Sequence, residues 1–243
     1  MLVLDNPVRR NTLTVPMVKA IVAAVAEIEA SDASALVVTG SGLAFCGGAD
    51  LGDLARPGSS EADKAASLRA IYEGFLAVAR SPLPTVAAVN GAAVGAGLNL
   101  ALGCDVRIVA ETTKLVPRFG ELGLHPGGGH TWMLARLGGP QTAAAMTLFG
   151  TTVGGRDAAR LGLAWACVPD DDLVAAAVAF AAGAAAVPRE LLARMKASLR
   201  DIPNLDTHAE AVDAELVPQL WSATTPEFAE RIAALSQRIS RPR

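Results

Sequence analysis

Several features that mark particular classes of protein are scarce in this sequence. Aromatic residues make up 4% of its 243 residues, and it has only three cysteines and three histidines. The cysteines lack the paired spacing of a zinc site or a redox couple, so we expect three small, buried and reduced thiols. The formal net charge of −3 gives no reason to expect nucleic acid or an anionic membrane as a partner.

Long apolar runs and targeting signals are missing as well. No stretch approaches about 18 uninterrupted apolar residues, and no basic region followed by an apolar run and a cleavage site begins the chain. The longest alanine-rich run, 173–187, is interrupted by Gly183 and followed by Pro188. We therefore expect a soluble, cytoplasmic protein whose core is built mainly from Ala, Val and Leu.

The most informative segment follows an apolar run at 35–40 that we predict to be a buried strand. Residues 45–51 read Phe-Cys-Gly-Gly-Ala-Asp-Leu. A strand that runs into two glycines and a short helical start leaves backbone N–H groups unpaired and directed at one point. The segment 84–100 repeats the design with a strand, a turn, small residues and an Ala/Leu-rich helix start. Two such donors would polarise a carbonyl and stabilise an enolate, which is acyl-thioester chemistry.

Four ordered motifs of this chain resemble the enoyl-CoA hydratase/isomerase (crotonase) superfamily. They are the segments 45–51 and 88–110, the segment 122–139, and the opening 6–13, which is similar to the family's RP-x-x-x-NAL signature. The resemblance covers almost the whole chain. It implies an acyl-CoA substrate and no cofactor other than the coenzyme A of that substrate.

The resemblance also implies a fold and an assembly. The fold is α/β, a crotonase-like (ClpP/crotonase) spiral of ββα repeats that binds acyl-CoA within 1–172. An all-helical C-terminal region, 173–243, follows and packs in a trimer. Its apolar residues exceed what a thin two-layer appendage needs for a core, so we expect a homotrimer or a dimer of trimers.

Periodicity predicts alternating elements that end in helices only. The expected strands are 35–39, 85–89, 106–109, 114–117 and 164–168. The expected helices are 17–30, 61–80, 97–102, 131–137, 141–148 and 155–161, followed by 173–187, 189–200, 206–223 and 226–239.

The resemblance assigns the oxyanion donors to the backbone N–H groups of Ala49 and Ala96. The residues that it implies for acyl-CoA binding are Phe45, Cys46, Gly47, Gly48, Asp50, Leu51, Gly95 and Phe119. We interpret Asp50 mainly as a residue that holds its turn by Asx hydrogen bonds. A nucleophilic role for Cys46 is disfavoured, because no His or Asn partner lies near it in sequence. Cations that could flank the phosphates of coenzyme A are Arg9, Arg10, Arg56, Lys64 and Arg69.

The expected catalytic carboxylates are absent. In hydratases of the family two glutamates hold the attacking water, because syn hydration needs two protonation partners on one face. A gapless alignment places these glutamates at Asn99 and Phe119. Neither side chain can exchange a proton at neutral pH. The sequence retains the means to hold a thioester and lacks the expected means to hydrate it.

Three nearby polar residues are candidates to replace the carboxylates. Glu121 lies two residues past Phe119 and would face the same side if the chain were extended there, although it also suits a surface position. His125 could act as a base with a pKa near neutrality, or pack locally as a loop residue. Asn99 could orient a water or donate to a carbonyl. We expect His130, which follows three glycines, to cap or lead the next helix.

The sequence alone is compatible with three functions. The first is an enoyl-CoA hydratase-like lyase that adds water to a trans-2-enoyl-CoA. The second is another reaction of the family, isomerisation or thioester hydrolysis, with Glu121 or His125 as the base. The third is a non-catalytic acyl-CoA-binding protein, which Asn99 and Phe119 favour. The oxyanion segments argue against the third, because a binder has less need of preorganised enolate stabilisation.

Overall fold

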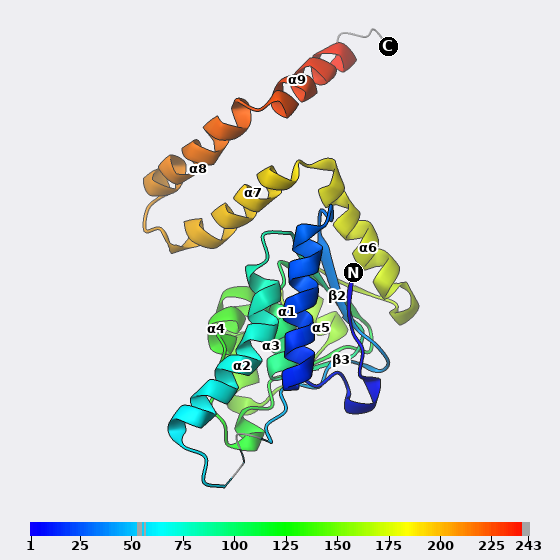
Figure 1. The fold of residues 1–243 in the computed structure, drawn as a ribbon, viewed down its shortest axis with the longest axis vertical. Coiled ribbons are helices and arrows are strands. Elements are labelled where there is room, and N and C mark those ends of the chain that lie inside the picture. Colours follow the sequence, from blue (N-terminus) through cyan, green and yellow to red (C-terminus); the bar gives the residue numbers. More distant parts are fainter. Residues whose placement is uncertain (53–54, 56, 240–243) are drawn as a thin grey trace.

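The computed structural model describes residues 1–52, 55 and 57–239, and two β-sheets form its centre (Figure 1). The larger sheet is entirely parallel, in the order β1 (Leu2–Leu4), β2 (Leu36–Gly40), β4 (Thr85–Val89), β6 (Val106–Ala110), β9 (Ala166–Val168). The smaller sheet has the order β3 (Ala44–Cys46), β5 (Ala92–Val94), β7 (Lys114–Val116), β8 (Val153–Gly154), and its last pair is antiparallel.

The chain builds both sheets by repeating one ββα turn. In each turn the first strand joins the larger sheet, the second joins the smaller sheet, and a helix follows. The turns are β2–β3–α2 (Glu61–Arg80), β4–β5–α3 (Ala96–Gly103) and β6–β7–α4 (His130–Phe149). Before them, β1 and α1 (Val15–Ala30) flank Leu13, which pairs with Ala49 in a single parallel bridge. The ββα spiral predicted from the sequence is confirmed.

Helix boundaries follow from local capping. The capping box between Ser60 and Asp63 begins α2, so the predicted 61–80 matches its bounds. α1 begins two residues before the predicted start, because Thr14 Oγ1 accepts a hydrogen bond from the backbone N of Met17. The helices predicted at 131–137 and 141–148 form α4, which is bent at Gly139 (φ 76°, ψ 171°).

The sequence prediction missed β1, β3, β5 and β8, each only two or three residues long. The remaining short elements are α5 (Gly155–Arg160) and the 3₁₀ helices η1 (Pro7–Arg9), η2 (Gly120–Leu122), η3 (Asp170–Asp172), η4 (Gly183–Ala186) and η5 (Ile202–Asn204).

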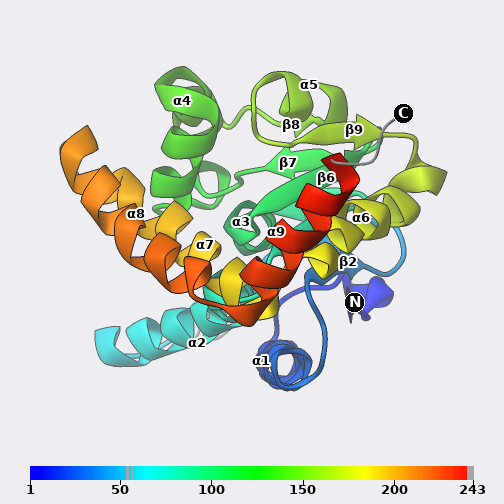
Figure 2. The same ribbon diagram turned by 90° about the horizontal axis from the view of Figure 1, so that it is seen from above.

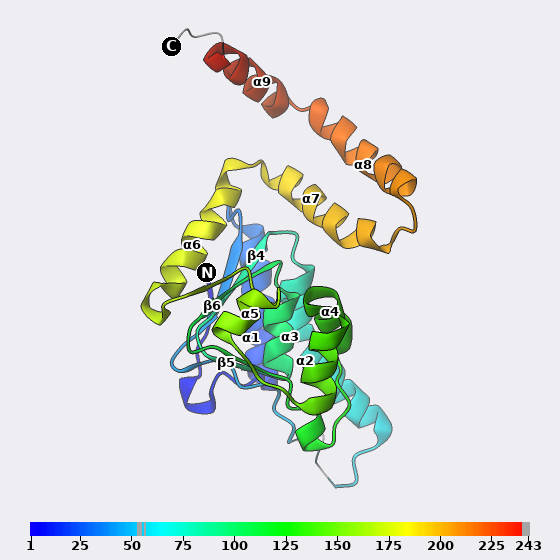
Figure 3. The same cartoon turned by 180° about the vertical axis from the view of Figure 1, so that it is seen from behind.

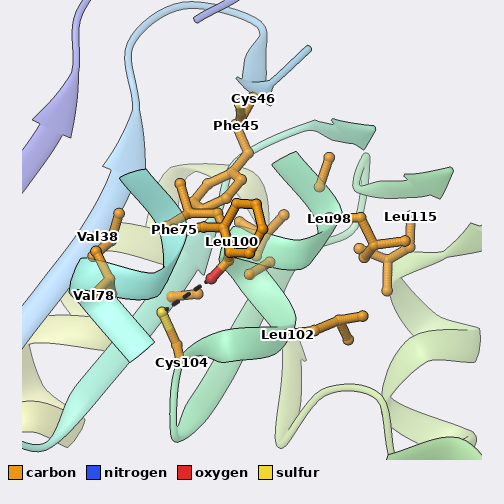
Figure 4. Packing of buried hydrophobic residues seen from close by; sticks show 14 of the residues in the cluster. Val38, Phe45, Cys46, Phe75, Val78, Leu98, Leu100, Leu102, Cys104 and Leu115 are labelled. Carbon is orange, nitrogen blue, oxygen red and sulfur yellow. Dashed lines mark hydrogen bonds between the residues drawn. The ribbon is translucent and has the colours of Figure 1, made fainter. Parts of the chain in front are cut away.

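The larger sheet is buried on both faces, as parallel sheets are. On one face the helices α1, α2 and α3 enclose the main core, where Phe45 and Phe75 lie against α3 (Figure 4). On the other face Leu173 and Ala177 of α6 (Leu173–Ala182) pack with residues of β2, β4 and β6. The first helix of the predicted C-terminal region, 173–243, therefore packs on the larger sheet.

The last three helices lie to one side of the sheets. They are α7 (Arg189–Asp201), α8 (His208–Ala223) and α9 (Pro226–Ile239). In Figures 1 and 3, α8 and α9 lie apart from the body of the molecule, and Figure 2 looks onto them from above. Lys196 of α7 is buried, and its Nζ lies 2.6 Å from Asp105 Oδ2 and donates to the carbonyl oxygen of Leu83 at 2.7 Å.

Arginines hold both ends of α7 to the core. Arg189 donates to the last carbonyls of α1, and Arg200 donates to those of α2, where the negative ends of the helix dipoles lie.

Among the described residues no single helix is long and apolar enough to cross a membrane. One pair of consecutive helices is long and apolar enough when taken together, but the two are bent by 109° at the break between them.

Candidate active site

Two glycine-rich loops meet at one end of the sheets. The first follows β3, and its Gly48 has φ +103°. The second leads from β5 into α3 through Gly95, which has φ +51° and is the N-cap of the helix. Positive φ angles suit glycine because it has no Cβ. A Cβ at Gly97 would lie 2.3 Å from the carbonyl oxygen of Cys46, so the start of α3 can approach the first loop only because that residue is glycine.

The approach places two backbone N–H groups, of Ala49 and Ala96, on one cavity. Leu13 pairs with the residues on either side of Ala49: Leu13 N donates to Gly48 O, and Asp50 N donates to Leu13 O. Ala96 is the first residue of α3, whose N–H has no partner within the helix. Within the described part of the chain, neither amide donates a hydrogen bond. Both donors are therefore available to a ligand.

Two asparagines hold the turn between β2 and β3, which leads into the first loop. Asn11 Nδ2 donates to the carbonyl oxygens of Ser41 at 3.0 Å and Ala44 at 2.8 Å, and its Oδ1 accepts from the backbone N of Asn6. Asn90 Nδ2 donates to the carbonyl oxygen of Gly42 at 2.9 Å. These side chains satisfy backbone groups that the short strands leave unpaired.

The cavity has a volume of about 120 Å³ and mostly apolar walls. α2 contributes Leu68, Ile71 and Tyr72, and the segment after β7 contributes Leu122 and Leu124. The predicted site residues that line it are Gly47, Gly48, Ala49 and Leu51 from the first loop, Gly95, Ala96 and Asn99 from the second, and Phe119 and His125 from the third segment.

Asn99 and Phe119 both face this cavity, as the alignment with the hydratase glutamates required. No carboxylate is among the described residues that line it. Its titratable lining groups there are Tyr72, Arg118 and His125. The described residues also contain no group of three or more His, Cys, Asp or Glu side chains placed to hold a metal.

The enoyl-CoA hydratase/isomerase family model matches residues 1–230. The chain belongs to this family. A probable enoyl-CoA hydratase of Mycobacterium tuberculosis is 47% identical over 245 residues, which cover 98% of this chain and 94% of the relative. The 1,2-epoxyphenylacetyl-CoA isomerase of Escherichia coli is 32% identical over 238 residues, which cover 96% and 90%.

Solved structures of the family have the same fold as this chain. An enoyl-CoA hydratase from Polaromonas has a TM-score of 0.90 and 28% identity, and the match covers 97% of this chain and 92% of that one. A Thermobifida fusca structure in complex with acetoacetyl-CoA has a TM-score of 0.79 and 32% identity, covering 90% and 89%. This chain is thus a crotonase-fold enzyme of the acyl-CoA-processing family.

Within this crotonase site the expectation for Glu121 is wrong. The backbone at 120–122 is a 3₁₀ helix rather than an extended strand, so alternate residues do not share a side. The Glu121 side chain is 70% exposed and pairs with Arg118, with 3.3 Å between Oε2 and Nε. It is not among the described residues that line the cavity.

His125 lies at the cavity, as expected, and is exposed to solvent at its rim. Its Nδ1 is 2.7 Å from the carbonyl oxygen of Pro126. A carbonyl oxygen only accepts, so the neutral ring carries its proton on Nδ1 and leaves the Nε2 lone pair free.

Three residues of the predicted binding set do not face the cavity. Phe45 and Cys46 are fully buried in the core beneath it (Figure 4), because β3 is covered on both sides. Burial raises the pKa of the Cys46 thiol to about 12, which excludes a nucleophilic thiolate. Asp50 instead accepts a hydrogen bond from the backbone N of Gly52 at 3.1 Å, the Asx turn that the sequence predicted, and pairs with Arg9.

The remaining predicted cations do not line the cavity. Lys64 and Arg69 are exposed on α2, and Arg10 is exposed near the start of the chain. Arg56 lies outside the described residues.

The sequence prediction underestimated His130. It does lead α4, as expected, but its side chain is buried and its Nδ1 lies 2.7 Å from Asn99 Oδ1. Burial lowers its pKa to about 4, so the imidazole is neutral at pH 7. The sequence signal that could have revealed this contact was the histidine directly after three glycines. If such a polar residue becomes buried, it requires a hydrogen-bond partner from another segment.

Proposed function

We propose that this enzyme adds water to a short trans-2-enoyl-CoA, with the thioester oxygen bound by the N–H groups of Ala49 and Ala96. The observation that carries the proposal is the pair of unpartnered amides on one cavity. Such preorganised donors stabilise negative charge that develops on oxygen. The name of the Mycobacterium tuberculosis relative and the acetoacetyl-CoA complex of the Thermobifida fusca protein support the substrate class.

The reaction begins when water attacks C3 of the enoyl group. A C–O bond forms at C3, the electron pair of the double bond moves toward the thioester, and an enolate forms on the oxygen. One group takes a proton from the water, and one group gives a proton to C2. His125 can serve as one of these groups, because its Nε2 is free and an imidazole can both accept and give a proton.

The cavity favours a short acyl chain. Its volume of about 120 Å³ is small for a ligand cavity. A four-carbon acyl group suits this space, and a longer chain requires side chains to move. The apolar walls exclude bulk water, which strengthens the interaction of the two amides with the enolate.

Two measurements on the wild-type protein test the proposal. Steady-state hydration of crotonyl-CoA reports turnover, and calorimetric titration with acetoacetyl-CoA reports binding. We expect both, and we expect His125→Ala to lower kcat by about 10²-fold or more while acetoacetyl-CoA affinity changes by only a few-fold. Binding without turnover on any enoyl-CoA would support the acyl-CoA-binding alternative and overturn the enzymatic proposal.

A second candidate reaction is isomerisation of an enoyl-CoA. It is favoured by the described cavity lining, which contains one imidazole and no carboxylate. A double-bond shift needs one group that removes a proton from one carbon and returns it to another, with no attacking water. The Escherichia coli relative is named an isomerase. Assay of a 3-enoyl-CoA beside crotonyl-CoA distinguishes the two reactions.

We also propose that the enzyme assembles as a homotrimer or a dimer of trimers. Exposed apolar side chains on α8 and α9 support an assembly, and they include Leu216, Val217, Leu220, Ile232 and Leu235. Light scattering at micromolar concentration tests this, and a monomer mass of 24.8 kDa would contradict it.

A further inference from the structure

The imidazole of His130 contacts both side chains that stand where hydratases of the family carry their glutamates. His130 is the first residue of α4 and is 1% exposed. Its Nδ1 lies 2.7 Å from Asn99 Oδ1. Its ring meets the ring of Phe119 edge-on, with 4.7 Å between centroids. Three segments far apart in the sequence thus converge on one buried imidazole.

The hydrogen bonds determine which nitrogen of His130 carries the proton. Asn99 Nδ2 donates to the carbonyl oxygen of Gly127 at 2.9 Å, which turns Asn99 Oδ1 toward the imidazole. This oxygen can only accept, so the neutral ring has its proton on Nδ1 and its lone pair on Nε2. Asn99 therefore sets the tautomer of His130 in the way that a third residue orients a catalytic base.

The Nε2 atom of His130 is buried and has no hydrogen-bond partner among the described residues. A buried acceptor without a partner is costly and uncommon in native proteins, and such groups concentrate at functional sites. Burial lowers the pKa of His130, so the imidazole is neutral at pH 7 and Nε2 keeps its lone pair. The hydrogen-bond geometry leads to the same point, since Asn99 occupies Nδ1 and leaves Nε2 free.

Asn99, which contacts the imidazole, lies on the helix that carries one of the proposed oxyanion donors. Asn99 is one turn along α3 from Ala96, and its backbone N donates to the carbonyl oxygen of Gly95 at 3.0 Å. A Cβ at Gly95 would lie 3.9 Å from Phe119 Cζ, so the end of the Phe119 ring reaches the start of the second loop. This ring both lines the cavity and contacts the imidazole, whereas His130 itself is not among the described residues that line the cavity.

We propose that His130 Nε2 is the proton acceptor for the attacking water, that Asn99 is its positioning residue, and that the Phe119 ring controls access to it. This inference rests on the proposed hydration. Nε2 takes a proton from water as the water oxygen bonds to C3, and the double-bond electrons form the enolate. His125 in its protonated form then gives a proton from Nε2 to C2, and solvent afterwards takes one proton from His130 and returns one to His125.

His130→Gln tests the inference most directly. The glutamine amide can still donate to Asn99 Oδ1, but it has no basic nitrogen. We expect kcat on crotonyl-CoA to fall by about 10²-fold or more while KM and Tm stay near their wild-type values. A purely structural histidine would leave kcat within about tenfold in this variant, which would overturn the inference. His208→Gln, which changes the histidine at the exposed start of α8, is the matched control and is expected to retain full activity.

Nitrogen NMR of the wild-type histidines provides a readout that needs neither turnover nor a variant. On saturation with acetoacetyl-CoA, we expect the Nε2 resonance of His130 to shift while its Nδ1 resonance changes little. An unchanged Nε2 resonance overturns the inference even if hydration is observed. A shift in a protein that does not hydrate crotonyl-CoA supports the exposure of His130 to the ligand and refutes the proposed hydration alone. Failure to bind acetoacetyl-CoA overturns both.

Discussion

Replacement of Ala96 by proline removes one proposed oxyanion donor and leaves every side-chain contact of the acid/base groups in place. Ala96 is the first residue of α3, a position where proline is tolerated because the N–H there has no helical partner. Helix stability should therefore change little. Ala96 lines the cavity, and its N–H donates to no carbonyl within the described residues.

The expected magnitude follows from the role of the donor. Loss of one oxyanion-hole hydrogen bond costs about 2.7–4 kcal/mol, or 10²–10³ in kcat. We expect Ala96→Pro to show this loss in steady-state hydration of crotonyl-CoA. Ala96→Gly keeps the N–H and is the matched control, with an expected kcat within a few-fold of wild type and a stability loss of up to about 1 kcal/mol.

Two further measurements separate loss of the donor from obstruction by the proline ring. Obstruction weakens inhibition by the saturated butyryl-CoA, whereas loss of the donor mainly lowers kcat, because charge develops on oxygen only in the transition state. The reasoning is refuted if Ala96→Pro turns over as fast as Ala96→Gly. It is also refuted if a thioester-bound structure places the carbonyl oxygen more than about 4 Å from both the Ala49 and the Ala96 nitrogen.

Three other predictions test the site and its support. Glu121→Gln should leave kcat on crotonyl-CoA unchanged, because this side chain is 70% exposed and points away from the cavity, and a large loss would contradict the placement. Gly97→Ala should lower Tm and activity, since its Cβ would lie 2.3 Å from the carbonyl oxygen of Cys46, and Gly120→Ala, with nothing within 4 Å, is the control. Because burial lowers the pKa of His130 to about 4, below its value in the unfolded chain, the unfolded state binds more protons between about pH 6.5 and 4. Stability in denaturant titrations should therefore fall as pH drops through that range, and His130→Gln should flatten the slope.

Local sequence determined much of the fold and both amide donors. Strand and helix order could be predicted because apolar runs and caps act within a few residues, and the capping box at Ser60 fixed the start of α2. The resemblance to the family located Ala49 and Ala96 at the proposed donor positions, and main-chain donors do not depend on the identity of the side chain. The three-residue strands could not be predicted, because a strand of that length is defined by its partners in the sheet.

Tertiary structure alone decided which side chains serve the site. Glu121 was assigned from alternation along an extended chain, and a single 3₁₀ turn with an ion pair to Arg118 turned it to solvent. His130 was read as the start of a helix, and its role arises only from contact with Asn99, 31 residues earlier, and with Phe119. Hydrophobic periodicity in the sequence indicates which face of its helix or strand a residue occupies. The partner of a buried polar group depends on how separate elements pack, so the sequence could specify the oxyanion loops and only the folded chain could reveal the imidazole between them.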